Sequence, residues 1–369
     1  MTFNVDQLGL PTEIEDEVRR LHATYEFEKL AEKGENGHLL IARNRVLDRR
    51  VAIKFYYWAD GVRLHVEPQS LAAVRSDAII EILEASVIGE EWALFVTPYC
   101  ANGDLDRFRE SHRFGLRSGL RFVERLLHGV SALHAARMVH RDLKPENILV
   151  ADDTLPLIAD FGSVRVVPEQ QLDVPGSGHA VLYRPPDSFE SRRYDFRGDV
   201  YQCGIVLYQV LGGRLVYDAM AYLDAQQREQ YAASDDDYER SRIVDDAIRD
   251  RVVAGRLIDL SSLPYFVPRS SRSIIRKATA TDPVQRYQSA GDIVSAVHAA
   301  WNNSIDWEYE DGGPVARSHR GRYRLLPSDT RGQFVLHQDL GSGWRKLPGS
   351  GVGNLEAQLR VLEQRIRAR

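Results

Sequence analysis

The chain has 369 residues, of which 43% are hydrophobic and 27% charged, a composition typical of globular proteins and not of disordered chains. With 48 basic and 53 acidic side chains the net charge is −5, which excludes a uniformly basic nucleic-acid-binding protein. Two cysteines, Cys100 and Cys203, exclude a disulfide scaffold and a four-cysteine zinc site. No apolar run approaches the roughly 18–20 residues that span a bilayer. The N-terminus lacks a basic-then-apolar signal sequence, so we expect a cytoplasmic protein.

The first 24 residues are expected to form a helical extension. Thr12 and Glu15 have the spacing of a capping box, in which two side chains satisfy backbone N–H groups at the start of a helix. Apolar side chains then recur on one helical face, at Ile14, Val18 and Leu21.

A strand-rich region follows this extension. Residues 25–57 predict three strands, the first two joined by a glycine-containing turn. Residues 67–75 are expected to form a helix with Pro68 in its first turn, and residues 79–83 and 92–97 are further apolar runs.

Helical periodicity dominates after Asn102 and Gly103. A hairpin is expected beyond Asn147, with strands at 148–150 and 155–159. From Asp199 to about residue 300 the pattern is mainly helical. The first of these helical segments repeats apolar side chains at Leu120, Val123, Leu127 and Val130.

The last part of the chain differs in charge from the rest. Residues 302–315 are polar and acidic and contain a Gly-Gly-Pro break, which predicts a linker. Residues 316–369 contain 11 basic and 4 acidic side chains, so they carry +7 and leave −12 on the remainder. Their pattern predicts a small β/α module with short strands and a helix from Leu355 to the end. Such a module would bind a protein, dock on the acidic remainder of the same chain or, with less support, bind nucleic acid.

The chemistry of the chain concentrates in residues 140–162. Two short strings, HRDLKPEN and, 13 residues after it, DFG, bring together Asp142, Asn147 and Asp160. Their hard oxygen atoms suit Mg²⁺, which in turn binds phosphate oxygens, and Lys144 adds a positive charge. Phosphoryl transfer needs metal ions to neutralise phosphate, a cation near the transferred group and a carboxylate to orient the attacking hydroxyl.

Both strings match, without substitution, the catalytic loop and metal-binding motif of the eukaryotic-type (Hanks-type) serine/threonine protein kinase family, which the chain resembles over residues 25–301. The resemblance implies an α+β, bilobal protein-kinase fold. A small β-rich lobe would occupy 25–98, a hinge 97–104 and a larger helical lobe 104–301.

The resemblance also implies roles for the residues of the two strings. Asp142 would orient the substrate hydroxyl, and Lys144 would stabilise the γ-phosphoryl group of ATP during transfer. Asn147 and Asp160 would hold Mg²⁺ or Mn²⁺. The position of Lys144, two residues after Asp142, is similar to the pattern of serine/threonine-specific kinases and not to that of tyrosine-specific ones.

Upstream, the string VAIK ending at Lys54 resembles the strand that carries the phosphate-binding lysine. Lys54 would hold the α- and β-phosphates, and Glu67 is assigned as its ion-pair partner. Gly34 and Gly37 resemble the glycine-rich loop that covers the phosphates, although Glu32 stands where the family has its first glycine.

Residues 95–105 resemble the hinge between the lobes. Its gatekeeper would be Thr97, and Asp104 would bond the ribose. Around the adenine the resemblance places the backbone of Pro98 and Cys100 and the side chains of Leu39 and Ala52.

Structural roles are implied as well. Asp199 would hold the backbone of the catalytic loop. Asp187 would pair with Arg286, although the family has the longer glutamate at the position of Asp187. An apolar spine, in which His140 packs and does not act as a base, would consist of Leu71, Leu83, His140 and Phe161.

Two states of the loop before Pro185 stay open. Either Ser177 is phosphorylated and its phosphate binds Arg141, or the loop is ordered without phosphorylation.

We therefore expect an ATP-dependent serine/threonine protein kinase that acts on protein substrates, itself included, and has no membrane contact. The alternatives are a pseudokinase that signals by its shape, and a scaffold whose basic C-terminal module binds a protein or nucleic-acid partner.

Overall fold

The computed structural model describes residues 3–34, 37–57, 69, 72–152, 154–176 and 181–367. The chain divides into two compact units. The first unit combines Met1–Phe108, His128–Ser177 and Arg193–Asp199, and the second combines Arg109–Leu127, Gly178–Arg192 and Val200–Arg369. In the described part of the chain, every helix is too short or too polar to cross a membrane.

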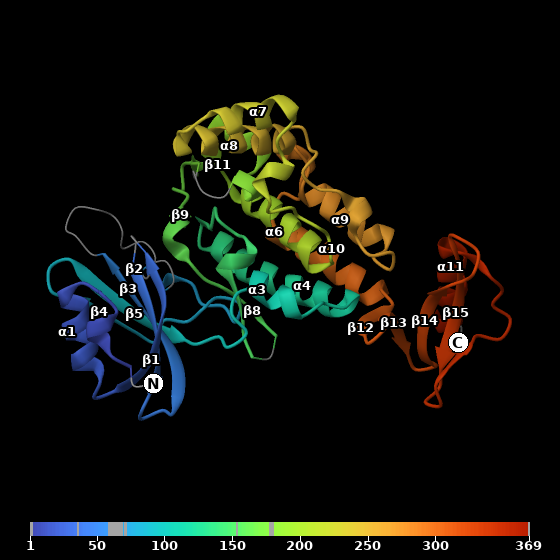
Figure 1. Ribbon diagram of the computed structural model, residues 1–369, viewed down its shortest axis with the longest axis horizontal. Helices are drawn as coiled ribbons and strands as arrows, with labels where there is room; N and C mark the ends of the chain where they lie inside the picture. The colour runs from blue at the N-terminus through green and yellow to red at the C-terminus, as the bar shows by residue number, and fades with distance from the viewer. Residues whose placement is uncertain are drawn as a thin grey trace. The chain divides into compact units, whose positions relative to one another are not determined.

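A five-stranded antiparallel sheet forms the β-rich N-terminal region (Figure 1). Its strand order is β1-β2-β3-β5-β4. Successive side chains of β3 point to opposite faces. Val51, Ile53 and Phe55 belong to a buried core, which leaves Ala52 and Lys54 on the other face. The bounds are β1 Tyr25–Gly34, β2 Gly37–Asn44, β3 Arg49–Tyr57, β4 Glu84–Ile88 and β5 Trp92–Pro98.

The helix α1 (Thr12–Leu21) lies against this sheet and shares the buried core with β3 (Figure 1). Ile14 and Val18 are fully buried there, as their spacing predicted. The predicted capping box did not form. Pro11 occupies the N-cap position, and no side chain there accepts a hydrogen bond from the first helical N–H groups. Thr12 is already the first helical residue, so its hydroxyl is past the capping position. The extension is therefore part of the N-terminal core.

Strand β4 begins later than the apolar run at 79–83 indicated. Ile79 forms an isolated parallel bridge with Ile158, and the N–H of Ile80 donates to the carbonyl of Ile158 at 3.0 Å. Sheet pairing starts only at Glu84. The predicted helix at 67–75 falls largely outside the described residues.

Three short two-stranded sheets belong to the first unit. Strand β6 (Met138–Val139) pairs with β9 (Arg165–Val166), β7 (Ile148–Val150) with β8 (Pro156–Ile158), and β10 (Val174–Pro175) with β11 (Arg193–Tyr194). The β7–β8 pair confirms the predicted hairpin. Two 3₁₀ turns, Pro145–Asn147 and Phe161–Ser163, carry the ends of the HRDLKPEN and DFG strings.

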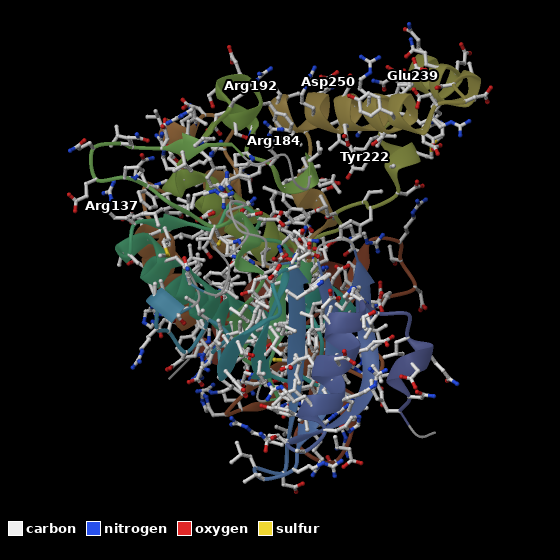
Figure 2. All side chains as sticks on the ribbon, turned by 90° about the vertical axis from the view of Figure 1, so that its left-hand side faces the viewer. Arg137, Arg184, Arg192, Tyr222, Glu239 and Asp250 are labelled. Carbon is white, nitrogen blue, oxygen red and sulfur yellow. The ribbon has the colours of Figure 1, made fainter. Side chains whose placement is uncertain are left out.

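Helices dominate the chain from residue 105 to residue 303. In the second unit, Ile205 of α6 and Ile248 of α8 share a buried core with Tyr222. Figure 2 shows Tyr222 below α8, with Glu239 and Asp250 on the outer side of that helix. The bounds are α3 Leu105–Ser111, α4 Leu116–Ala135, α5 Pro186–Ser191, α6 Phe196–Val210, α7 Ala225–Ala233, α8 Asp237–Val253, α9 Arg269–Ala278 and α10 Ala290–Asn303. Further 3₁₀ turns lie at Val5–Gln7, Val181–Tyr183, Ala219–Ala221, Leu260–Ser262 and Pro283–Gln285.

The C-terminal module is an antiparallel sheet of order β12-β13-β14-β15-β16, with β17 also pairing with β15, and the helix α11 packs against β15 (Figure 1). Its strands and its helix from Leu355 agree with the sequence pattern. The bounds are β12 Asp306–Glu310, β13 Gly313–Ser318, β14 Gly321–Pro327, β15 Gln333–Asp339, β16 Trp344–Lys346, β17 Gly353–Asn354 and α11 Leu355–Arg367.

The linker predicted at 302–315 is instead the first hairpin of this module, formed by β12 and β13. Gly312 and Gly313 adopt φ values of +96° and +120°, which glycine tolerates best. The Gly-Gly-Pro sequence is therefore a turn between two strands and not a break between two domains.

Aromatic packing joins the module to the helical region within the second unit. Trp307 of β12 is 2% exposed, and its ring stacks on Phe266 at a centroid distance of 5.3 Å. The edge of Tyr265 contacts the same indole. A Cβ on Gly115 would lie 2.1 Å from the carbonyl oxygen of Trp307, so only glycine fits just before α4.

Candidate active site

Asp199, near the start of α6, holds the catalytic loop by its backbone. Its carboxylate accepts hydrogen bonds from the N–H groups of His140 and Arg141, each at 2.9 Å. The hydroxyl of Tyr194 and Nε2 of His134 also lie 2.9 Å from it. Burial opposes the charged carboxylate, but His134 and the N–H of Arg141 outweigh burial and lower the pKa of Asp199. A buried anion therefore fixes the loop, as the resemblance implied.

Sequence reasoning missed His134 and Tyr194. A signal for His134 existed, because it follows the buried Val130 by four residues and so falls on the buried face of α4. Tyr194 follows no motif, and only the fold brings it to Asp199.

Asp142 lies at the centre of the candidate site and is 5% exposed. Its Oδ2 accepts a hydrogen bond from Nδ2 of Asn147 at 2.9 Å and pairs with Nζ of Lys144 at 3.1 Å. Its Oδ1 is buried and has no hydrogen-bond partner among the described residues. Because a buried acceptor without a donor is costly, this oxygen is suited to a hydroxyl that enters from outside. The structure thus brings together two of the expected catalytic residues, Asp142 and Lys144, and the expected metal-binding residue Asn147.

His140 is a packing residue, as expected. Its ring meets Phe161 edge to face at a centroid distance of 5.4 Å, and its Nε2 lies 3.3 Å from the carbonyl of Ala159. Burial lowers the pKa of His140, so the ring is neutral at neutral pH. Of the other expected spine members, Leu71 lies outside the described residues, and Leu83 packs against the core of the N-terminal region.

Asn147 and Asp160 carry the oxygen atoms expected to bind a metal. The amide nitrogen of Asn147 donates two hydrogen bonds to Asp142, at 2.8 Å and 2.9 Å, so its Oδ1 is the atom left for the expected metal ion. Asp160 is exposed and takes a left-handed backbone conformation with φ of +56°. Its Oδ1 accepts a long 3.4 Å bond from the N–H of Gly162. An amide and a carboxylate oxygen of this kind suit a hard divalent cation.

Lys54 lies on β3, opposite Leu39 of β2 and Phe95 of β5. Its Nζ lies 5.8 Å from the centroid of the Phe95 ring. Glu67, the assigned partner of Lys54, lies outside the described residues, so this ion pair stays a prediction.

Gly34 and Gly37 are paired at the end of the β1–β2 hairpin, which is where the resemblance to the glycine-rich loop placed them. A Cβ on Gly37 would lie 2.3 Å from the carbonyl oxygen of Phe55. The close approach of β3 therefore requires glycine at residue 37, whether or not a nucleotide binds.

The hinge residues begin in the last two positions of β5 and continue beyond it. Thr97 is 6% exposed and lies opposite Ala52 of β3, and Pro98 is the last residue of the strand. Cys100 is buried, and burial raises the pKa of its thiol to about 11. The thiol is therefore neutral at neutral pH and fits the role of a small buried side chain.

Asp104 has a structural task in addition to its expected one. Its Oδ1 accepts a hydrogen bond from the N–H of Arg107 at 2.9 Å and so caps the start of α3. The other carboxylate oxygen is the one that would bond a ribose, and that bond stays a prediction.

Arg141 orders the segment after the DFG string through backbone contacts. Its guanidinium donates to the carbonyls of Ser163 and Pro175, at 2.6 Å and 2.7 Å. Burial is the main cause that lowers the pKa of Arg141 to about 10, and the positive charge of Arg165 is the second cause. Ser177, its proposed phosphorylated partner, lies outside the described residues.

The ion pair between Asp187 and Arg286 forms as the resemblance implied. The carboxylate oxygen lies 2.5 Å from the guanidinium, and the Arg286 side chain is fully buried. Arg286 also donates to the carbonyl of Ala280 at 2.7 Å. The aspartate therefore reaches its partner although it is one methylene shorter than glutamate.

Comparisons with known proteins agree with this geometry. A family model described as "Protein kinase domain" matches residues 25–301. The chain is 25% identical over 297 residues to the serine/threonine-protein kinase PrkC of Bacillus subtilis (strain 168), which covers 77% of this chain and 41% of that protein. It is 28% identical over 253 residues to the serine/threonine-protein kinase PknL of Mycobacterium tuberculosis (strain CDC 1551 / Oshkosh), covering 66% and 57%.

A eukaryotic protein is also similar. The serine/threonine-protein kinase ULK3 of Xenopus laevis is 28% identical over 190 residues, covering 51% of this chain and 40% of that protein. The chain thus spans about half the length of the curated relatives that it matches. The kinase model accounts for about three quarters of the chain, and the HRDLKPEN residues take up the contacts described above. With its β-rich N-terminal and helical C-terminal regions, the chain therefore belongs to the protein kinase family.

Proposed function

We propose that this protein transfers the γ-phosphoryl group of ATP to serine and threonine hydroxyls of protein substrates. The observation that carries the proposal is the buried Oδ1 of Asp142, which has no donor among the described residues while Oδ2 is held by Asn147 and Lys144. A carboxylate fixed on one side and open on the other is suited to orient an incoming hydroxyl.

In the proposed reaction the substrate hydroxyl donates its hydrogen bond to Oδ1 of Asp142. Its oxygen forms a bond to the γ-phosphorus as the bond to the β–γ bridging oxygen breaks, and ADP leaves. The hydroxyl proton passes to Asp142. Lys144, held 3.1 Å from Asp142, places its positive charge beside the transferred group, and Lys54 holds the α- and β-phosphates.

Members of this family use ATP with a divalent metal ion, and we propose Mg²⁺, or Mn²⁺ in its place. Asn147 and Asp160 would hold the ion, which neutralises phosphate charge. The hydrogen bonds from Asn147 to Asp142 would then link the metal-binding residue directly to the residue that orients the hydroxyl.

We propose that the C-terminal module is docked on the kinase region of the same chain. Its support is the stacking of Trp307 on Phe266 and the fit of Trp307 against Gly115. The cytoplasmic location expected from the sequence stays a proposal.

Transfer of radiolabelled phosphate from ATP to a panel of peptides tests the proposed activity. The panel contains matched peptides with serine, threonine or tyrosine as the acceptor. We expect label on serine and threonine peptides, none on tyrosine peptides and none with Asp142→Ala. Asp152→Ala, an exposed carboxylate beyond β7, serves as the control and keeps activity. Label mainly on tyrosine, or equal label with Asp142→Ala, would contradict the proposal.

A further inference from the structure

A groove in the second unit shares no residue with the proposed phosphoryl-transfer site. Its volume is about 540 Å³, within the range of protein ligand pockets. The C-terminal end of α8, the segment 255–260, the helix α9 and residues 279–285 contribute to its walls.

The floor of the groove is apolar and firmly packed. Val252 and Tyr201 are 1% and 2% exposed, and with Leu257 they belong to the same buried core. The guanidinium of Arg286 lies 5.1 Å from the centroid of the Tyr201 ring, on which it packs. The floor is therefore preformed, and a ligand need not order it.

The walls of the groove carry positive charge. Arg276 and Lys277, adjacent and exposed on α9, line it, and none of its described lining residues is acidic. The nearby carboxylates of Asp259 and Asp282 do not line the groove, and each accepts a backbone N–H in the 3₁₀ turn that follows it. These two carboxylates therefore have a structural task, and the groove keeps its cationic character.

Hydroxyl groups complete the lining. Ser273 and Thr281 supply hydroxyl groups that an extended peptide backbone can use, and Thr279, whose hydroxyl donates to the carbonyl of Ile275 at 2.8 Å, adds an acceptor. An apolar floor, a pair of cations and several hydroxyls together match a ligand that has carboxylates, large apolar side chains and peptide groups.

We propose that this groove binds an acidic segment of a protein partner that also carries large apolar side chains. The carboxylates of the segment pair with Arg276 and Lys277, and its apolar side chains cover the partly exposed Ile258 and Leu260. Charge complementarity selects the partner, because the cations attract an acidic segment and repel a basic one.

Binding is measured by fluorescence anisotropy on the full chain, without ATP and at low ionic strength. The probe is a short labelled peptide of aspartate and glutamate with one leucine and one phenylalanine. We expect saturable binding that added salt weakens. Arg276→Glu combined with Lys277→Glu should weaken it about tenfold or more. Peptides with asparagine and glutamine for the acids, or alanine for the apolar residues, should also bind more weakly.

Three control variants make the outcome specific. Arg269→Glu reverses a charge on the same helix at a side chain that is 93% exposed and outside the groove, and it should keep the affinity. Arg276→Glu alone preserves the contact of Lys277 with Tyr287, at 4.4 Å from the ring centroid, and should still weaken binding if the fold is intact by thermal melting. Asp142→Asn should bind the peptide as the wild type does, so failure of phosphoryl transfer and failure of docking are separate results.

Several results would overturn the proposal. One is the lack of binding by the wild type at low salt, and another is equal affinity of the wild type and the doubly reversed variant. Self-association of the free protein that Arg276→Glu abolishes, measured by light scattering, would assign the groove to a second copy of the chain and not to a different partner.

Discussion

Among single residues, the fully buried Arg286 depends on partners that compensate its charge. Its guanidinium lies 2.5 Å from Asp187 and donates to the carbonyls of Ala280 and Thr281, so its charge is compensated inside the second unit. Removal of a carboxylate from such a pair leaves an uncompensated buried cation.

We predict that Asp187→Ala lowers the free energy of unfolding by about 3 kcal/mol, measured by urea denaturation. Asp187→Glu, the residue of the wider family, restores an acidic partner and should remain within about 1 kcal/mol of the wild type. Equal stability of Asp187→Ala and the wild type would mean that the ion pair contributes nothing to the fold.

His140 makes stability depend on pH. Burial holds its pKa below the ordinary value of 6.5, so the unfolded chain binds a proton at His140 at a pH where the folded protein does not. The free energy of unfolding therefore falls as the pH drops below 6.5, by up to about 1.4 kcal/mol per pH unit from this residue. His140→Phe should lose this part of the slope in urea denaturation.

The exposed His128 of α4 is the matched control for the loss of an imidazole, and His128→Phe is measured alongside. The lowered pKa of Asp199 affects stability in a different pH range. The stabilisation that Asp199 contributes is lost only as the pH falls below 3.8, the ordinary pKa of an aspartate. Identical slopes for His140→Phe and the wild type would refute the assignment.

At the level of elements, the N-terminal extension is part of the kinase region. Helix α1 supplies Ile14 and Val18 to the core that it shares with β3, on the face opposite Lys54. We predict that Ile14→Ala lowers the free energy of unfolding by about 2–4 kcal/mol, measured by urea denaturation. Glu13→Ala on the exposed side of α1 should change it by less than about 0.5 kcal/mol. Equal effects of the two variants would show that α1 does not pack as described.

Periodicity predicted the existence of most elements better than their ends. The apolar spacing in α1 and the β7–β8 hairpin were predictable from residues alone. The capping box failed because Thr12 is one residue too far into the helix. The linker failed because Gly-Gly-Pro is typical of both a hairpin turn and a domain boundary, and only the pairing of β12 with β13 distinguishes the two.

The candidate site was more predictable than the elements around it. The HRDLKPEN string brings Asp142, Lys144 and Asn147 into contact because their spacing is short and local. His134 and Tyr194 reach Asp199 from distant parts of the chain, and no local spacing encodes that approach. The cationic groove was not predicted for the same reason, because α8, α9 and the segment 279–285 meet only in the folded unit.

At the scale of the whole molecule, the kinase region and the C-terminal module should unfold together. Trp307 is buried between them, and its loss would open a cavity against Phe266. We predict that Trp307→Ala lowers the free energy of unfolding by about 3–5 kcal/mol and splits a single thermal transition into two. Calorimetry of the full chain measures both effects.

Trp344 is the matched control, because it lies in the same module, is only half-buried and packs on the guanidinium of Arg324 at 4.3 Å. Trp344→Ala should keep a single transition. A single transition in Trp307→Ala as well would mean that the module is not coupled to the kinase region through this contact.

The measurement that tests the central claim most directly is the turnover number for phosphoryl transfer from ATP to a serine peptide, for the wild type and Asp142→Asn. The substitution keeps the shape of the side chain and removes the carboxylate that accepts the hydroxyl proton in the proposed reaction. We predict a fall of at least about 100-fold in the turnover number, with ATP affinity changed by less than about threefold. Wild-type turnover in Asp142→Asn would contradict the account.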